Sequence, residues 1–77
     1  MWAMSLKTAK PFQRRIRKNI LRLVGEKNIT LERLAVEADL TSSFVSQVLA
    51  GRSSISLAAL ERLADVLGVD ITELLRS

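Results

Sequence analysis

The sequence predicts an all-α protein, a bundle of five short helices in one domain. Apolar residues recur at the spacing of amphipathic helices, and no stretch alternates apolar and polar residues as a strand does. Capping residues and glycines separate the apolar stretches, as they do at helix ends. The chain has 77 residues, of which 4% are aromatic, so its core must be small and aliphatic.

The first expected helix covers residues 11–27. Pro11 suits its first turn, where a missing N–H costs nothing, and Asn28 can take the left-handed conformation that ends a helix. Residues 1–10 show no clear period, so we expect them to form a flexible basic N-terminal arm before a domain at 11–77. The apolar face of the helix comprises Phe12, Ile16, Ile20, Leu23 and Val24.

Two shorter helices are expected at 31–38 and 42–50, joined by a tight turn at Asp39. Thr30 and Thr41 stand directly before these helices. A threonine at this position is an N-cap, because its side-chain oxygen accepts a hydrogen bond from a free backbone N–H of the first turn.

The helix expected at 42–50 has two distinct faces at 100° per residue. The apolar face must pack on the core and comprises Phe44, Val45, Val48 and Leu49. The polar face is directed outward and comprises Ser42, Ser43, Ser46, Gln47 and Ala50. Gly51 is expected to end the helix in the left-handed conformation. Two short helices joined by a turn, the second with a polar outer face, indicate a helix-turn-helix at about residues 30–50.

Two further helices are expected at 57–67 and 71–76. Ser56 caps the first and Gly68 ends it, and Asp70 with an acid three residues later forms a capping-box-like start for the second. Their apolar faces comprise Leu57, Leu60, Leu63, Ala64 and Leu67, then Ile71, Leu74 and Leu75.

Histidine and cysteine are both absent, which excludes disulfides and thiolate metal sites and removes the usual general base. We therefore expect no enzyme, no cofactor and no metal site. No apolar run approaches the length of a membrane span, and the apolar opening residues are too few for a signal peptide. The expectation is a cytoplasmic protein without a membrane partner.

Basic charge is concentrated near the N-terminus. Residues 1–25 hold seven basic side chains and no acid, whereas 26–77 hold five basic and eight acidic side chains. The seven are Lys7, Lys10, Arg14, Arg15, Arg17, Lys18 and Arg22. This asymmetry suggests a polyanionic partner. The basic segment has three open interpretations: a solvated helix face, a surface for DNA phosphates or the minor groove, and a membrane-surface helix. The last is disfavoured because the bundle needs its apolar residues.

The run from Thr30 to Leu67 resembles the Cro/CI-type (XRE) family of helix-turn-helix regulators, without a gap. The matching features are Leu34-Ala35, Leu40-Thr41, Val45-Ser46, Gly51-Arg52, Ser56-Leu57, Leu60 and Leu67-Gly68-Val69. The resemblance covers about residues 16–75 and implies a five-helix bundle of the lambda-repressor-like DNA-binding domain type.

The resemblance also implies how the chain would bind double-stranded DNA, with the helix at 42–50 in the major groove. The DNA-binding positions that it carries over are Thr41, Ser42, Ser43, Ser46, Gln47 and Arg52. Ser42, Ser43 and Gln47 would touch base edges, and Arg52 would contact a phosphate. Glutamine can bond bidentately to adenine, and serine can bond to several bases.

Three positions depart from the family pattern. Leu31 stands where members often have a glutamine that bonds a phosphate. Val24 and Leu49 stand where many members have a paired arginine and glutamate, so a charged pair is replaced by an apolar one. Asp39 stands where the turn often has glycine, and aspartate tolerates a left-handed φ better than most residues.

The resemblance implies a sequence-specific transcriptional regulator, a repressor or controller protein, acting as a homodimer on a palindromic operator. The dimer would form through the C-terminal helices. The alternative is an antitoxin or another interaction module whose main partner is a protein. Short members of the family occur as phage repressors, as controllers of restriction–modification systems and as antitoxins, and the length of this chain fits all three.

Overall fold

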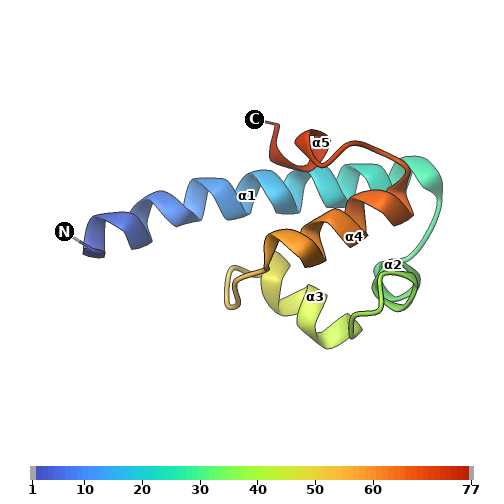
Figure 1. The fold of residues 1–77 in the computed structure, drawn as a ribbon, viewed down its shortest axis with the longest axis horizontal. Helices are drawn as coiled ribbons and strands as arrows, with labels where there is room; N and C mark the ends of the chain where they lie inside the picture. The colour runs from blue at the N-terminus through green and yellow to red at the C-terminus, as the bar shows by residue number, and fades with distance from the viewer. Residues whose placement is uncertain (1, 77) are drawn as a thin grey trace.

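A computed structural model describes residues 2–76 of the chain, and the side chains of residues 12–76. Its five helices are α1 (Trp2–Lys27), α2 (Leu31–Glu37), α3 (Ser42–Leu49), α4 (Leu57–Leu67) and α5 (Thr72–Leu75), with no strand in the described part (Figure 1). The predicted all-α fold of five helices is confirmed.

Helix α1 begins well before its expected start, because the helical backbone continues across Pro11 to Trp2. A proline inside a helix costs about 3 kcal/mol through one lost backbone hydrogen bond and a steric clash. The preceding segment is rich in alanine, leucine, lysine and methionine, which favour helix. Pro11 is therefore not the boundary between an arm and the helix. The flexibility expected of residues 1–10 stays a prediction, and their side chains lie outside the described part.

The N-caps expected at the starts of α2, α3 and α4 are confirmed. The side-chain oxygens of Thr30 and Thr41 each accept a hydrogen bond from a backbone N–H three residues later, at 3.0 Å. The side-chain oxygen of Ser56 does the same at 3.1 Å. Each cap satisfies a backbone donor of the first turn, and this fixes where the three short helices begin.

Residues with a left-handed backbone conformation lie at the helix ends and in the turn where they were expected. Asn28 has a φ of 57° at the end of α1, and Asp39 has a φ of 60° in the turn between α2 and α3. Gly51 and Gly68 have φ values of 78° and 70° after α3 and α4. Asp39 thus takes the conformation for which family members often use glycine.

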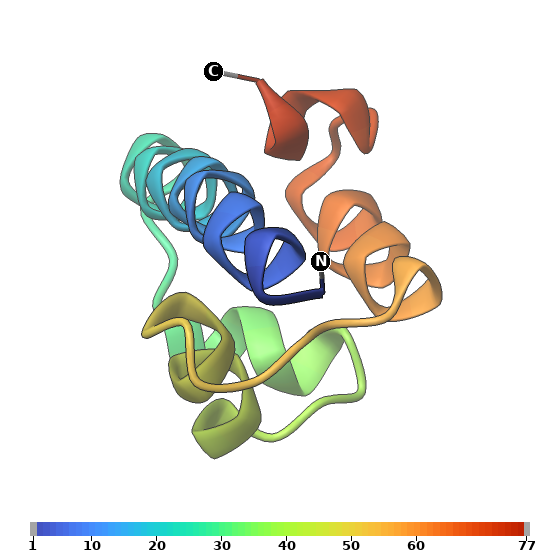
Figure 2. The same ribbon diagram turned by 90° about the vertical axis from the view of Figure 1, so that its left-hand side faces the viewer.

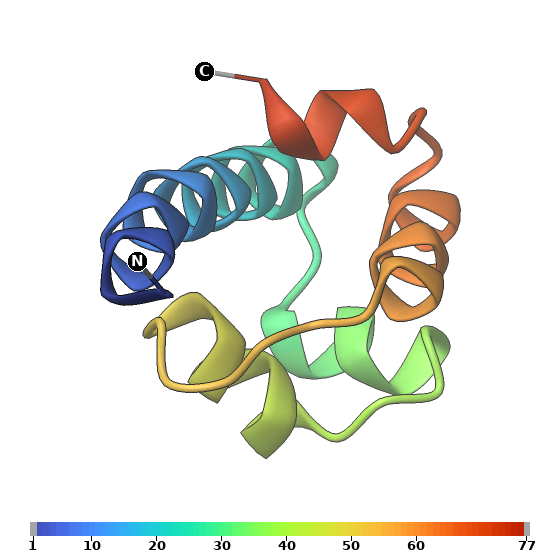
Figure 3. The same cartoon turned by 60° about the vertical axis from the view of Figure 1, so that its left-hand side comes forward.

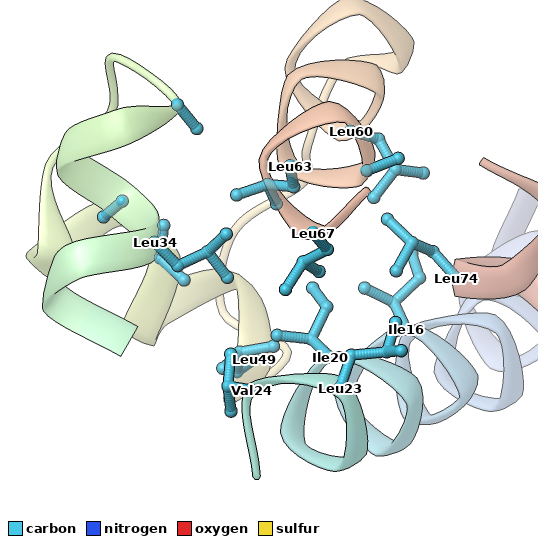
Figure 4. Close-up of a cluster of buried hydrophobic side chains, with 14 residues drawn as sticks. Ile16, Ile20, Leu23, Val24, Leu34, Leu49, Leu60, Leu63, Leu67 and Leu74 are labelled. Atoms are coloured by element: carbon cyan, nitrogen blue, oxygen red, sulfur yellow. The ribbon is translucent and has the colours of Figure 1, made fainter. Parts of the chain in front are cut away.

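The core is a single aliphatic cluster at the centre of the bundle (Figure 4). Its fully buried side chains come from all five helices and include Ile16, Ile20, Leu34, Val45, Leu63, Leu67 and Leu74. Two expected members of the core are exposed instead, namely Phe12 at 45% and Leu57 at 66%. Both stand at the outer end of an apolar stripe, where the neighbouring helices no longer cover the side chain. Ala59, two residues further along the first turn of α4, is buried.

Helix α5 is shorter than expected and does not use a capping box. The Asp70 carboxylate accepts hydrogen bonds from the backbone N–H and the hydroxyl of Thr72, both at 2.9 Å, while Glu73 pairs with Arg76. Helix α5 lies at one end of the molecule, and α2 and α3 lie at the opposite end (Figures 2 and 3). The helix-turn-helix and the C-terminal helix therefore occupy separate surfaces.

Candidate nucleic-acid interface

Helix α3 is held in place by its apolar face. Val45 and Val48 are 1% and 3% exposed, and Leu49 is 9% exposed. Helices α1 and α2 both pack against α3. The packed apolar face therefore holds the polar face of α3 in a fixed position. A surface that must fit a groove needs such a rigid support.

The predicted reading positions form one exposed face. Ser42, Ser43, Ser46 and Gln47 are all exposed on the outer side of α3. Thr41 is also exposed, and its hydroxyl oxygen is occupied by the backbone N–H of Phe44. One lone pair of this oxygen is thus used for the helix cap.

Gln47 has a hydrogen-bond partner that could not be predicted from the sequence. The Ser53 hydroxyl donates to the Gln47 side-chain Oε1 at 3.1 Å. This hydrogen bond engages the side-chain oxygen of Gln47 within the protein. A serine six residues after an exposed glutamine gives no periodic signal, because Gly51 reverses the chain between them.

Arg52 lies three residues after the end of α3 and is exposed. Its backbone N–H donates to the carbonyl oxygen of Gln47 at 2.9 Å, which fixes the backbone at this point. The ion pairs within residues 12–76 are Arg22–Glu26, Arg33–Glu37 and Arg76–Glu73, and Arg52 takes part in none of them.

Two surface hollows lie between α1 and the C-terminal half of α3. One, of about 230 Å³, is lined by Gln13, Arg14, Arg17, Leu49, Ala50 and Gly51. The other, of about 430 Å³, is lined by Arg17, Leu21, Leu31, Ser46, Leu49 and Ala50. Basic side chains of α1 thus lie beside the polar face of α3.

A helix-turn-helix family model matches residues 20–74, which is most of the chain. The chain belongs to the XRE-type helix-turn-helix family. This membership places it among DNA-binding regulators of transcription.

A crystal structure of a hypothetical transcription factor from Neisseria, NHTF, is similar to this chain, with a TM-score of 0.80 and 29% sequence identity. The match covers 84% of this chain and 75% of the other. A search of curated proteins found no match.

The departures from the XRE pattern have clear structural outcomes. Val24 and Leu49 are 8% and 9% exposed, and both belong to the core cluster. The apolar pair thus adds to the core where a charged pair would need desolvation. Leu31 is half-buried and lines the larger hollow, and its apolar side chain has no group that could donate to a phosphate.

Charge on this XRE-type domain is unevenly placed. The first turn of α3 carries no acid and its last turn no base. The hollow between α4 and α5 is lined by Glu61, Asp65 and Asp70 as well as Arg62. Positive charge near the polar face of α3 therefore comes from Arg52 and from α1, whereas three of the eight acids line the hollow between α4 and α5.

The described residues include no group of acidic side chains that could hold a metal ion. No helix in this part of the chain is long and apolar enough to cross a membrane.

Proposed function

We propose that this protein is a sequence-specific transcriptional regulator that reads double-stranded DNA with α3 in the major groove. The observation that carries the proposal is the exposed row of short hydrogen-bonding side chains on α3 above a buried anchor. An α-helix fits the major groove, where each base pair presents a distinct pattern of donors and acceptors.

The side chains have different proposed roles. Ser42, Ser43 and Gln47 contact base edges, and Thr41 and Ser46 flank them. Arg52, exposed at the end of α3, contacts a phosphate and so contributes affinity and register. A well-formed pair of hydrogen bonds to a base is worth about 1–3 kcal/mol of discrimination.

We also propose that the regulator acts as a homodimer on a palindromic operator. The C-terminal helices are the proposed contact, since Ile71 and Leu75 are half-buried apolar residues there. Helix α5 lies opposite α3, so a partner seated on α5 leaves the reading face free (Figure 3). The two half-sites would lie about 34 Å apart, which is one turn of DNA.

Selection of duplexes from a random pool, followed by binding measurements at fixed salt, tests the reading role. We expect Gln47→Ala and Ser43→Ala each to lower the ratio of affinities for the selected site and bulk DNA, by about five- to a hundredfold. Glu61→Ala, an exposed change on α4, is the control and should leave that ratio unchanged. A ratio that neither α3 variant lowers would contradict the proposal.

The mass of the complex on the selected duplex tests the dimer. We expect two chains per palindromic site, and we expect Leu75→Glu to give one chain per half-site with weaker binding, because a charge at a closed apolar contact is costly. One wild-type chain per selected site would overturn the dimer without affecting the reading role. A chain that binds a co-purified protein tightly but no duplex at low salt would instead support an interaction module.

Repression is the simplest regulatory outcome. A small domain seated over a promoter excludes polymerase, and control then depends on the concentration of the regulator. A reporter gene driven by a promoter that overlaps the selected site should be expressed less when the protein is present. Increased expression from this promoter would identify an activator.

A further inference from the structure

We propose that Arg14 and Arg17 of α1 form a phosphate-binding site for the DNA strand that passes the C-terminal end of α3. This inference rests on the proposed DNA binding and extends it to a second helix. It assigns electrostatic contact with the phosphates to these two arginines and not to Arg15 and Arg22 of the same helix.

Position is the first argument. Arg14 and Arg17 line the smaller hollow together with Ala50 and Gly51. Arg17 also lines the larger hollow, which it shares with Ser46 of the reading face. A strand whose bases meet α3 therefore runs within reach of these two guanidinium groups.

The electrostatics of α3 are the second argument. The C-terminal end of a helix carries partial negative charge on its free carbonyl groups and repels an anion. Helix α3 has no basic residue in its last turn to offset this charge. A phosphate near Ala50 and Gly51 therefore needs cations from outside the helix, and the arginines of α1 that line the hollow add to the charge of Arg52 there.

Availability is the third argument. Arg14 and Arg17 are exposed, and within residues 12–76 neither takes part in an ion pair. Arg22, by contrast, pairs with Glu26 at 3.3 Å. Free hydrated arginines are suited to phosphates, because their contact releases condensed counterions from the DNA.

Arg15 and Arg22 provide a matched control on the same helix. At 100° per residue Arg15 points roughly 160° away from Arg17, and Arg22 roughly 140° away. Neither lines either of the hollows beside α3. The control pair carries the same charge as the proposed pair but faces away from the reading helix.

The test compares Arg14→Gln/Arg17→Gln with Arg15→Gln/Arg22→Gln, both of which lower the net charge by the same amount. Affinity for the selected duplex and for a random duplex is measured over a salt series. We expect the first double variant to flatten the slope of log affinity against log salt by about two, since each phosphate contact contributes about 0.9. Its affinity for both duplexes should fall by about ten- to a hundredfold at 0.1 M salt, and its preference for the selected site should stay the same.

The control pair should leave the slope close to that of the wild type. Equal flattening by the two double variants would overturn the proposal, because only the overall charge would then matter. An unchanged slope in Arg14→Gln/Arg17→Gln would overturn it as well. Circular dichroism at each salt concentration verifies that both variants are folded, and the single variant Arg17→Gln should show about half the change in slope.

If α3 does not read the DNA sequence, the binding measurements give a different result from failure of the phosphate site. A wild-type protein that binds all duplexes equally, with a steep salt slope carried by Arg14 and Arg17, would contradict sequence reading and support the phosphate site. A wild-type protein that binds no duplex at low salt would overturn both.

Discussion

The side-chain amide of Asn19 donates to the backbone carbonyl oxygen of Leu74 at 3.0 Å, and the same nitrogen donates to the carbonyl oxygen of Arg76 at 2.8 Å. Asn19 is 4% exposed, on the core side of α1. Carbonyl groups at the end of a helix have no partner within the helix. Asn19 satisfies two such groups and fastens the C-terminal segment to α1, the helix that also supports α3.

We expect Asn19→Ala to lower the free energy of unfolding by about 1–3 kcal/mol, because it leaves the buried carbonyl oxygen of Leu74 without a donor. Urea denaturation followed by circular dichroism measures this loss. Lys18→Ala, at an exposed position next to it, is the control and should change the free energy of unfolding by less than about 0.5 kcal/mol. Equal losses in the two variants would show that the two hydrogen bonds add nothing to stability.

Two glycines should respond to alanine in opposite directions. Gly25 lies inside α1, and an added Cβ there meets nothing within 4 Å. Gly25→Ala should therefore raise the free energy of unfolding by about 0.5–1 kcal/mol, because alanine loses less backbone freedom on folding. Gly68 has a φ of 70°, also with open space around an added Cβ. Gly68→Ala should lower the free energy of unfolding by about 1–2 kcal/mol through the left-handed backbone alone. Thermal melts that shift in the same direction for both variants would contradict this explanation.

Asp70 gives the fold a defined pH dependence. Hydrogen bonds from the backbone N–H and then the hydroxyl of Thr72 lower the pKa of Asp70 below its ordinary value of 3.8. A carboxyl whose pKa is lowered in the folded state stabilises the fold above its unfolded pKa, and this stability is lost as the pH falls through the folded value.

We expect Asp70→Asn to destabilise the protein at pH 7 and to match the wild type more closely once the pH falls below the lowered pKa of Asp70, where the carboxyl of the folded wild type is also neutral. Thr72→Val removes the hydroxyl donor and keeps the backbone donor, so its effect should be intermediate. Urea denaturation at a series of pH values measures the difference. A gap between wild type and Asp70→Asn that is constant with pH would contradict the role of the charge.

Local rules explain why most of the fold could be predicted. The caps at Thr30, Thr41 and Ser56 and the left-handed residues depend on neighbours a few positions away, so the sequence contains all the information that they need. The start of α1 could not be placed in this way. Pro11 is a strong local signal, but helix-favouring residues lie on both sides of it and the helix continues.

Part of the candidate site could likewise be predicted from local rules, and part could not. The outward face of α3 follows from helical periodicity, and the structure exposes each serine and glutamine that periodicity placed there. The residues that other segments place beside this face cannot be predicted from helical periodicity. Arg14 and Arg17 are separated from Ser46 by about thirty residues of sequence, and only the packing of α1 on α3 brings them beside it. The contact between Ser53 and Gln47 likewise depends on the reversal at Gly51.

On the proposed reading role of Gln47, we expect that contact to make Ser53 a determinant of which base Gln47 prefers. The Ser53 hydroxyl engages Oε1 of Gln47, so we expect Nε2 to be the group that meets the DNA. A donor favours base edges rich in acceptors, and guanine offers both N7 and O6 in the major groove. Ser53→Ala should therefore broaden the preference at the base pair facing Gln47 and lower the affinity for the selected site by about two- to tenfold, the worth of one net hydrogen bond.

Base-by-base competition with substituted duplexes measures this preference, with Ser54→Ala as the control at the adjacent exposed position. Adding Ser53→Ala to Gln47→Ala should cause no further loss, because the serine acts only through the glutamine. If Ser53→Ala weakened binding to every duplex equally, or further weakened the Gln47→Ala variant, the hydroxyl would be acting on the DNA directly. The orientation of Gln47 would then be set by the base that it meets.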